Sequence, residues 1–308
     1  MFPNSVIKSG RRMHRILLLG ATGFVGGAIG TELRTQLPET ALRALVRPQA
    51  MARDAGPRVE AVPGDILNPQ DVARAAESCE AIINAVGIIA EQGSNTFEAV
   101  HTDAVQTSLA AAKHGVKRYL LISALGTRKD ARSRYHRTKF RGEELLRTSG
   151  LDFTIFRPSV IFGRRDRFIN LLARIVRIAP LIPVVGAGKN RFQPVFVEEL
   201  ARMVRISLAE GKGSREVVPV GGAAAYTYNE IIALLKRLLR REYKPVLHLP
   251  MAMAGFLARH LGKPLNYDQW LMLQEDNVLG EGEFARLEEL FGFRPSSMEE
   301  VLPRYLSA

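Results

Sequence analysis

The fold is decided by one stretch near the amino terminus, Arg15-Ile16-Leu17-Leu18-Leu19-Gly20-Ala21-Thr22-Gly23-Phe24-Val25-Gly26. An apolar run leads into three glycines spaced G-x-x-G-x-x-G, which is typical of a strand that turns into a helix. Gly20 allows a tight turn, Gly23 lets a pyrophosphate approach the backbone, and Gly26 lets the helix pack closely on the strand. Glycine also serves such turns for steric reasons alone, but the apolar lead-in and the following helix favour a dinucleotide site. The residues expected to contact the nucleotide here are Gly20, Thr22, Gly23, Phe24, Val25 and Gly26.

Strand-like and helical patterns alternate along the rest of the first half of the chain. This alternation predicts an α/β fold, a doubly wound parallel sheet of the Rossmann type with right-handed crossovers. We expect residues 13–222 to form the dinucleotide-binding domain, with 163–192 contributing to a substrate region. Residues 223–308 are expected to form a smaller, mostly helical substrate or lid region. The expected strands are 15–19, 41–47, 59–62, 81–87, 117–123, 151–157 and 217–222.

The chain of 308 residues has a formal net charge of +12 and a single cysteine, Cys79. One cysteine excludes an internal disulfide framework and suits a reducing compartment. The basic excess indicates an anionic ligand or an acidic membrane surface as a partner. No recognised nucleic-acid motif accompanies the charge, so nucleic acid is not expected. The sequence shows no apolar run long enough to span a membrane, and residues 1–12 lack the apolar core of a signal peptide. We therefore expect a cytoplasmic protein, and any membrane binding is expected to be peripheral, on the cytoplasmic face.

The second strand ends with an arginine, and this ending bears on the choice of cofactor. In NAD-binding units an acidic residue about twenty positions beyond the glycines accepts the ribose 2′-hydroxyl, whereas an arginine there can hold a 2′-phosphate. Arg43 and Arg47 lie near the end of the strand, and no Asp or Glu occupies it. The sequence therefore favours NADP(H) over NAD(H), the alternative for each arginine being an ordinary solvated side chain.

Two further strand ends are candidates for the adenosine part of the nucleotide. Asp65, followed by Ile66, can accept a hydrogen bond from the adenine amino group, and a turn or helix-capping role is its alternative. Small residues end the fourth strand, where a ribose can lie against the backbone. These residues are Ala85, Val86 and Gly87.

A tyrosine and a lysine four positions apart, Tyr135 and Lys139, begin a predicted helix and share one face of it. A phenol needs a neighbouring cation to act as acid or base near neutral pH, and Lys139 can supply that charge while bonding a ribose. Ser123, at the end of the fifth strand, would polarise a carbonyl that Tyr135 protonates. An ordinary amphipathic helix is the alternative. His136 is expected at the surface, and no cluster of residues has metal-ligand spacing.

These motifs resemble those of the extended and atypical short-chain dehydrogenase/reductase family, an epimerase/dehydratase-like group. The matching segments are Gly20 to Gly26, Gly64-Asp65, Tyr135-x-x-x-Lys139, and Arg157-Pro158-Ser159 through Gly163. Within the family, the segments 158–170 and 193–197 are similar to bacterial relatives of the nucleotide-binding accessory subunit of respiratory complex I.

The resemblance implies a tightly held NADPH, with a structural rather than a catalytic role in the accessory subunit, and a respiratory complex as a partner. It also implies that Pro158, Ser159 and Val160 pass beside the nicotinamide. Two positions depart from the catalytic pattern. Ala124 stands where many members carry a second hydroxyl residue, and His101 stands where catalytic relatives usually have asparagine.

The second half of the chain carries amphipathic and apolar helical patterns. Residues 168–177 have one apolar face with basic edges, suited to a substrate cleft, an anionic membrane or a partner, although core packing accounts for most of the apolar residues. The segment 250–258 is apolar with two methionines and suggests the lid of a hydrophobic pocket, plain core being its alternative.

Three hypotheses follow from these patterns. The first is an NADP(H)-dependent oxidoreductase acting on a small hydrophobic carbonyl or alcohol, quinone-like substrates included. The second is a non-catalytic NADP(H)-binding protein of a respiratory or other membrane-associated complex. The third, a nucleotide-sugar epimerase or dehydratase, fits the wider family but finds no support in the apolar C-terminal region.

Overall fold

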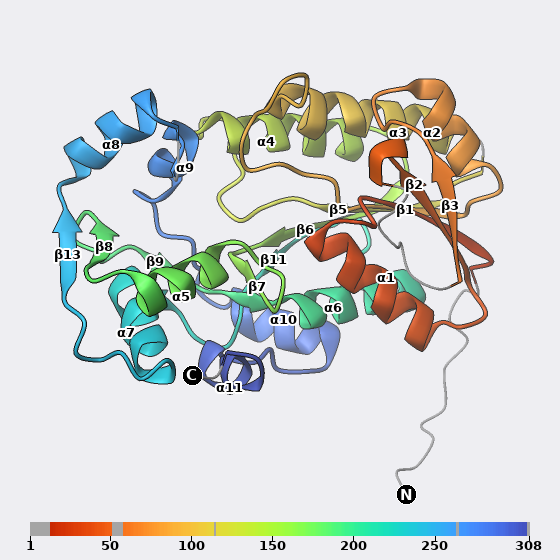
Figure 1. The fold of residues 1–308 in the computed structure, drawn as a ribbon. Helices are drawn as coiled ribbons and strands as arrows, with labels where there is room; N and C mark the ends of the chain where they lie inside the picture. Colours follow the sequence, from red (N-terminus) through yellow and green to blue (C-terminus); the bar gives the residue numbers. More distant parts are fainter. Residues whose placement is uncertain (1–12, 51–57, 114, 263–264, 307–308) are drawn as a thin grey trace, which may run out of the picture.

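Seven parallel strands form the central sheet of the computed structural model, which describes residues 13–50, 58–113, 115–262 and 265–306. Their order, β11-β6-β5-β4-β1-β2-β3, confirms the predicted doubly wound sheet (Figure 1). The strand predicted over 81–87 ends at Asn84, so 85–87 belong to the loop that follows. The strands are β1 (Arg15–Leu19), β2 (Ala41–Val46), β3 (Val59–Pro63), β4 (Ala81–Asn84), β5 (Arg118–Ile122), β6 (Asp152–Pro158) and β11 (Glu216–Val220).

Helices cover both faces of this sheet because its central strands are apolar on both sides. Ile16 and Leu18 of β1 belong to the core on one face, and Leu17 and Leu19 belong to the core on the other. This double burial is typical of parallel sheets in α/β proteins. One face carries α2 (Pro69–Ala76), the π-helix η2 (Ala99–Asp103), α3 (Ala104–Ala112) and α4 (Arg134–Arg147), and the other carries α1 (Phe24–Gln36), α6 (Val197–Glu210) and α10 (Glu283–Phe291) (Figure 1).

A second core lies beyond the sheet and joins residues of 161–197 to the C-terminal region. It contains Ile169 and Val176 of one helix together with Ile231 and Leu235 of another, all buried. The helices that contribute residues to it are α5 (Phe168–Ile178), α7 (Tyr228–Leu238) and α11 (Met298–Val301), and the other helices of this region are α8 (Met251–His260) and α9 (Tyr267–Met272). Its paired strands are β7 (Ile161–Phe162) with β10 (Val195–Phe196), β8 (Ile182–Val185) with β13 (Val246–Leu249), and β9 (Arg191–Phe192) with β12 (Tyr226–Thr227). Two short 3₁₀ helices, η1 (Pro48–Ala50) and η3 (Leu302–Arg304), complete the described elements.

The C-terminal region also returns to the sheet. Leu287 and Phe291 of α10 pack in the core beneath β11 and β6, where Phe291 meets Phe156 with ring centroids 6.2 Å apart. The mostly helical region from 223 onward therefore contributes one helix to the dinucleotide-binding half. Among the described residues, no helix combines the length and hydropathy that a bilayer crossing requires.

The strand order reverses between β1 and β4, and this point positions the candidate site. In open parallel sheets, ligands bind outside the carboxyl ends of the strands at such a switch point. β1 ends at Leu19, β4 at Asn84 and β5 at Ile122, and the parallel register brings all three ends to one edge. With the exception of Arg43, the candidate site residues named from the sequence lie in or next to the segments that begin at the carboxyl ends of the strands.

Candidate nucleotide-binding and active site

The glycine-rich turn leaves the amino end of α1 open. Gly20 has a φ of +85°, and a Cβ there would lie 2.9 Å from the carbonyl oxygen of Ala85. Gly23 precedes α1 without any side-chain cap, and the first turn of the helix contains no acidic residue. Amides at an uncapped helix start are a ready site for an anion. Thr22, Phe24 and Val25 lie in this same turn, as the predicted diphosphate site requires.

Gly26 is the residue of the turn that has the least room for a side chain. A Cβ at Gly26 would lie 2.1 Å from the carbonyl oxygen of Gly20, so helix and turn must separate if one is added. We expect Gly26→Ala to abolish measurable NADPH binding in calorimetry, because the amides at the helix start would be displaced. Gly27→Ala is the matched control, since its Cβ would lie an ordinary 3.5 Å from the nearest backbone atom. Equal affinity in the Gly26 variant and wild type would place the diphosphate elsewhere.

The two arginines near the end of β2 occupy different environments. Arg43 is buried and donates to the carbonyl oxygens of Ala75 (3.2 Å) and Glu77 (2.9 Å), and its guanidinium pairs with Glu60 at 2.9 Å. It therefore ties the end of α2 to the sheet and is not available to a ribose phosphate, which corrects the expectation for this residue. Arg47 follows the last residue of β2 and is exposed.

Asp65 has the turn role that the sequence left as an alternative. Its Oδ1 accepts from the amide of Leu67 at 2.9 Å, and its own amide donates to Asp71 at 2.9 Å. Ile66 lies inside this turn and packs partly against the core. The carboxylate is exposed, so its second oxygen stays open to a ligand such as an adenine amino group.

The segment after β4 joins the nucleotide turn to the catalytic candidates. Ala85 donates its amide to the carbonyl oxygen of Leu19 at 3.0 Å, and the amide of Val86 is held by the side chain of Asn84 at 3.0 Å. Gly87 comes next, and a Cβ there would lie 3.6 Å from the ammonium of Lys139. The three residues predicted to face a ribose therefore lead directly to the predicted lysine.

Tyr135 and Lys139 lie one turn apart at the start of α4, which Ser133 caps by accepting from the amide of His136. The Lys139 ammonium is 5.6 Å from the centre of the Tyr135 ring and donates to the carbonyl oxygen of Ile122 at 3.2 Å. Burial lowers the pKa of Lys139 to about 8, against the attraction of Glu143. Burial raises the pKa of the Tyr135 phenol. The tyrosine is therefore set up as a proton donor rather than as a phenolate.

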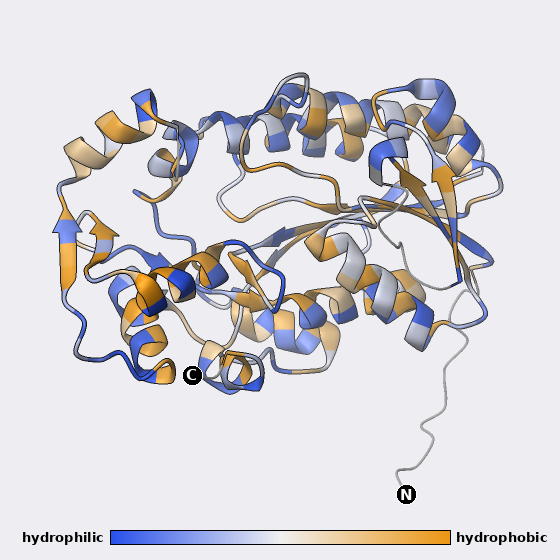
Figure 2. Cartoon of the chain, viewed as in Figure 1, coloured by the Kyte–Doolittle hydropathy of each residue, from blue (hydrophilic) through white to orange (hydrophobic). Residues whose placement is uncertain are grey.

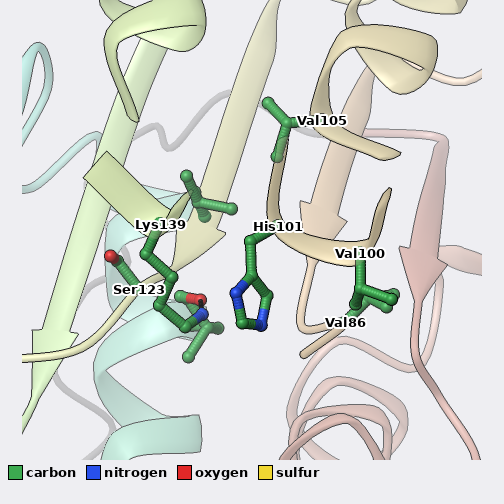
Figure 3. Close-up of a pocket in the computed structure, with 8 residues that line it drawn as sticks. Val86, Val100, His101, Val105, Ser123 and Lys139 are labelled. Carbon is green, nitrogen blue, oxygen red and sulfur yellow. Dashed lines mark hydrogen bonds between the residues drawn. The ribbon is translucent and has the colours of Figure 1, made fainter. Parts of the chain in front are cut away.

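Ser123 has a partner that the sequence did not predict. Its hydroxyl donates to Glu143 at 2.5 Å, and the same fully buried carboxylate accepts from Arg157 at 2.9 and 2.5 Å. In Figure 3 the Ser123 hydroxyl points away from His101. The donor that was expected to polarise a substrate carbonyl is thus directed to Glu143. Glu143 follows Lys139 by one helical turn, and this spacing is the signal by which it could have been found.

His101 completes the site from a π-helical turn, a feature often found at functional sites. Its Nε2 accepts from the amide of Ile88 at 3.2 Å, so Nδ1 carries the proton and donates to Thr138 at 3.0 Å. Burial, reinforced by the charge of Lys139, lowers the pKa of His101 to about 2. A neutral ring therefore occupies the position that asparagine holds in catalytic relatives.

Together these side chains enclose a small pocket at the carboxyl ends of β4 and β5. His101 and Lys139 face each other across it (Figure 3). Most of its lining is apolar, and His101, Ser123 and Lys139 supply its polar groups. The lining residues are Val86, Val100, His101, Val105, Leu121, Ile122, Ser123 and Lys139.

The segment expected beside the nicotinamide is held by a C-terminal residue that sequence reasoning missed. The Ser159 hydroxyl contacts Asn277 at its carbonyl oxygen (2.8 Å) and at its Oδ1 (2.7 Å), and Asn277 donates to the carbonyl oxygen of Leu125 at 3.1 Å. The carbonyl oxygen of Pro158 accepts from Leu125, and that of Val160 accepts from Val195. These bonds fix the backbone that leaves β6 next to the end of β5.

His136 is buried, although the sequence predicted a surface position. Its Nδ1 contacts Ser133 at 3.0 Å and its ring lies against Gly126, while burial lowers its pKa to about 4. Within the described ranges, no group of three or more His, Cys, Asp or Glu side chains is placed to hold a metal ion.

Several known proteins are similar to this chain in sequence. A family model described as NAD(P)H-binding matches residues 20–167. The mitochondrial NADH dehydrogenase (ubiquinone) 1 alpha subcomplex subunit 9 of Arabidopsis thaliana is 28% identical over 85% of this chain and 68% of its own length. An uncharacterized sugar epimerase of Bacillus subtilis is 32% identical over 47% of this chain and 71% of its own length.

A solved structure extends the likeness to the fold of almost the whole chain. The NADPH-dependent quinone oxidoreductase of Escherichia coli, complexed with NADPH, superposes with a TM-score of 0.72 and 18% identity, covering 92% of this chain and 97% of that one. At this identity the match carries the fold alone. With the glycine turn and the seven-stranded sheet, these similarities show that the chain belongs to the NAD(P)H-binding short-chain dehydrogenase/reductase-like family.

Proposed function

We propose that this protein is an NADP(H)-dependent oxidoreductase that acts on a small hydrophobic carbonyl or alcohol, quinone-like substrates included. The observation that carries the proposal is the meeting of Tyr135 and Lys139 beside Gly87, at the edge where the open end of α1 also lies. A phenol and an ammonium beside a nucleotide turn are the groups that a carbonyl reduction requires.

The nucleotide would be held by residues along this edge. Amides of the turn from Gly20 to Gly26 bind the diphosphate, and Arg47 pairs with the 2′-phosphate. Asp65 accepts from the adenine amino group with Ile66 beside it, while Lys139 donates to a ribose hydroxyl. The segments that line the sugar and nicotinamide are Ala85 to Gly87 and Pro158 to Val160. The bound cofactor supplies or accepts hydride.

The chain's own contribution to the reaction is a proton from the Tyr135 phenol to the substrate oxygen. Because burial keeps this phenol protonated, it can donate over the whole neutral range. The Ser123 hydroxyl is directed to Glu143, so Tyr135 is the donor that remains for the substrate oxygen. The Lys139 ammonium stabilises the charge left on the phenol after transfer.

A second candidate is favoured by the same Ser123 contact. The Ser123 hydroxyl is bonded to Glu143, the next residue is Ala124, and His101 is neutral. The site therefore has fewer groups to polarise a substrate carbonyl than a carbonyl reductase usually has. A tightly held, non-reacting NADP(H) in a protein that docks on a respiratory complex fits these features. The similarity to a ubiquinone-linked NADH dehydrogenase subunit supports it. Either function suits a cytoplasmic protein at the membrane's inner face.

Turnover separates the two candidates. Purified protein is mixed with NADPH and a panel of quinones, ketones and aldehydes, and the absorbance of the reduced nicotinamide is followed. Oxidation that exceeds the rate without protein supports the oxidoreductase. NADPH that remains bound and reduced with every member of the panel would refute it in favour of the accessory protein. Nucleotide-sugar substrates in the same panel test the epimerase or dehydratase alternative.

Cofactor choice is predicted to depend on Arg47. We expect Arg47→Ala to weaken NADPH binding by about 1.5 to 3 kcal/mol, roughly ten- to a hundredfold in Kd, because it removes a charge-assisted contact to phosphate. NADH affinity should stay unchanged. Calorimetric titration of both nucleotides gives the comparison, with Lys117→Ala as the control, since Lys117 is exposed at the opposite edge of the sheet. Equal losses for both nucleotides would overturn the assignment of Arg47 to the 2′-phosphate.

A further inference from the structure

One end of the molecule exposes large apolar side chains that the proposed reaction does not use. Of ten large apolar residues exposed in the described ranges, six lie on α8, on the residue that follows it or on the segment before it. Phe256 and Leu261 are 64% and 68% exposed, and Tyr243 is 76% exposed. Clustered exposure of this kind marks an interaction site. We call this set the apolar end surface: Tyr243, Leu247, Met253, Phe256, Leu257 and Leu261.

Helix α8 is built so that its apolar residues cannot all be buried. Ala254, Gly255 and Ala258 form the face that packs on α9, where a Cβ at Gly255 would lie 2.6 Å from Trp270. Trp270 also donates to the carbonyl oxygen of Met251 at 3.1 Å, which fixes the helix in place. The opposite face carries exposed apolar side chains, and no element of the described part of the chain covers it (Figures 1 and 2). The sequence suggested a pocket lid here, and the structure leaves these side chains exposed instead.

The strand that leads into α8 extends the same surface. Leu247 of β13 is in register with Pro183 of β8, and both side chains are exposed on the outer side of this two-stranded pair. The Lys244 ammonium donates to the carbonyl oxygens of Arg177 and Ala179, both at 2.8 Å, and so ties the end of α5 to the segment before β13. Ile178 and Leu181, near the end of α5, are exposed as well, so exposed apolar side chains occur at the end of α5, on β13 and on α8.

The charge around this end is mainly positive, although α7 carries Glu230 in its first turn and α9, which packs on α8, carries Asp268. The two stretches that build it, 168–189 and 231–262, contain nine Lys and Arg residues but only one acidic residue, Glu242. Arg237 and Arg240 are exposed at the end of α7, and Arg259 is exposed on α8. A partner for this end must accept apolar side chains and supply negative charge around them.

We propose that the apolar end surface docks the protein on an anionic lipid bilayer. Leu and Phe side chains of an interfacial helix enter the boundary between headgroups and acyl chains, while basic side chains meet the lipid phosphates. Tyrosine is favoured at that same depth. The basic surroundings argue against a second copy of this chain as the occupant, because two such ends would repel each other.

Vesicle binding of the full chain tests the proposal. We expect the protein to float with vesicles of phosphatidylcholine mixed with phosphatidylglycerol, and to bind phosphatidylcholine vesicles at least about tenfold more weakly. Replacing Phe256 and Leu261 together by serine should lower binding to the anionic vesicles by about tenfold or more, because the buried apolar area is lost. Phe256→Leu with Leu261→Ile is the matched control, which keeps apolar side chains and should keep binding.

Charge reversal gives an independent arm of the test. Arg237→Glu with Arg240→Glu should weaken binding to anionic vesicles by about tenfold or more, whereas Lys113→Glu with Lys117→Glu, on exposed residues between α3 and β5, should not. Equal binding by the serine variant and wild type would overturn the proposal. The proposal would also be overturned if the wild-type protein stayed in the soluble fraction. Self-association of the wild type in sedimentation that the serine variant loses would overturn it too, in favour of a second copy of the chain as the partner. NADPH titration of the same variants reports on the nucleotide site separately, so failure of one proposal is distinguishable from failure of the other.

Discussion

Tyr135→Phe is expected to lower NADPH-dependent turnover by about two to four orders of magnitude, the usual contribution of a positioned proton donor. NADPH affinity and the free energy of unfolding should change little. The reason lies in the structure, where the phenol oxygen has no hydrogen-bond partner among the described residues, while the ring packs against Phe97 and His101. Phenylalanine keeps that packing and removes only the transferable proton. Initial rates with the best substrate of the panel measure the effect.

A second tyrosine supplies the control. Tyr119 is fully buried on β5 and bonds Asn84 (3.0 Å) and Ser108 (2.6 Å), away from the pocket. Tyr119→Phe should lose about 1 to 3 kcal/mol of stability, because buried partners are left unpaired, yet keep its turnover. If Tyr135→Phe retains wild-type rates while Tyr119→Phe behaves as expected, Tyr135 is not the proton donor.

The pH profile of the wild type adds an independent readout of Lys139. Burial lowers its pKa to about 8 from an ordinary value near 10.5, so its positive charge is lost as the pH rises through about 8. The charge that stabilises the ionised Tyr135 and bonds the ribose is present below that pH. Turnover should therefore fall on the alkaline side of about pH 8. A rate that stays constant well above this value would remove Lys139 from the reaction.

The fold was predictable because its signals are local. The glycine spacing fixes the first turn through backbone contacts alone, as the 2.1 Å approach of a Gly26 Cβ to Gly20 demonstrates. Apolar runs of strand length separated by helices then leave few alternatives to a doubly wound sheet. Ser123, Tyr135 and Lys139 were brought together by the same reasoning, because the carboxyl ends of parallel strands share one edge.

The hydrogen-bond partners of individual side chains were less predictable, because they depend on which residues the folded chain brings close together. Arg43 lies inside β2, where its side chain reaches the end of α2, whereas Arg47 follows the last residue of the strand, and the sequence does not show where the strand ends. Ser123 was expected to face a substrate, yet the nearest acceptor is a glutamate twenty residues later in the chain. Asn277 holds Ser159 from more than a hundred residues away, and no local pattern announces it.

Glu143 carries the largest expected effect on stability. We expect Glu143→Ala to destabilise the protein by about 3 to 5 kcal/mol, since it leaves the half-buried Arg157 guanidinium without its acceptor and removes the shorter of the two hydrogen bonds of the buried Ser123 hydroxyl. Denaturant unfolding measures the loss. Glu144→Ala is the matched control one position away. The Glu144 carboxylate is exposed and pairs with Arg147, which also pairs with Glu143 at 3.3 Å, so its loss should cost less than about 1 kcal/mol.

A double-mutant cycle with Arg157→Ala separates the pair from the site around it. If the carboxylate and the guanidinium stabilise each other directly, the double variant should lose less than the sum of the two single variants. Glu143→Gln then addresses the chemistry, because the side chain retains its size while the carboxylate that accepts from Ser123 becomes a neutral amide. A faster turnover in this variant would mean that Glu143 withholds the Ser123 hydroxyl from substrate. An unchanged rate with lower stability would mean that Ser123 and Glu143 serve the fold, leaving Tyr135 as the donor on which catalysis depends.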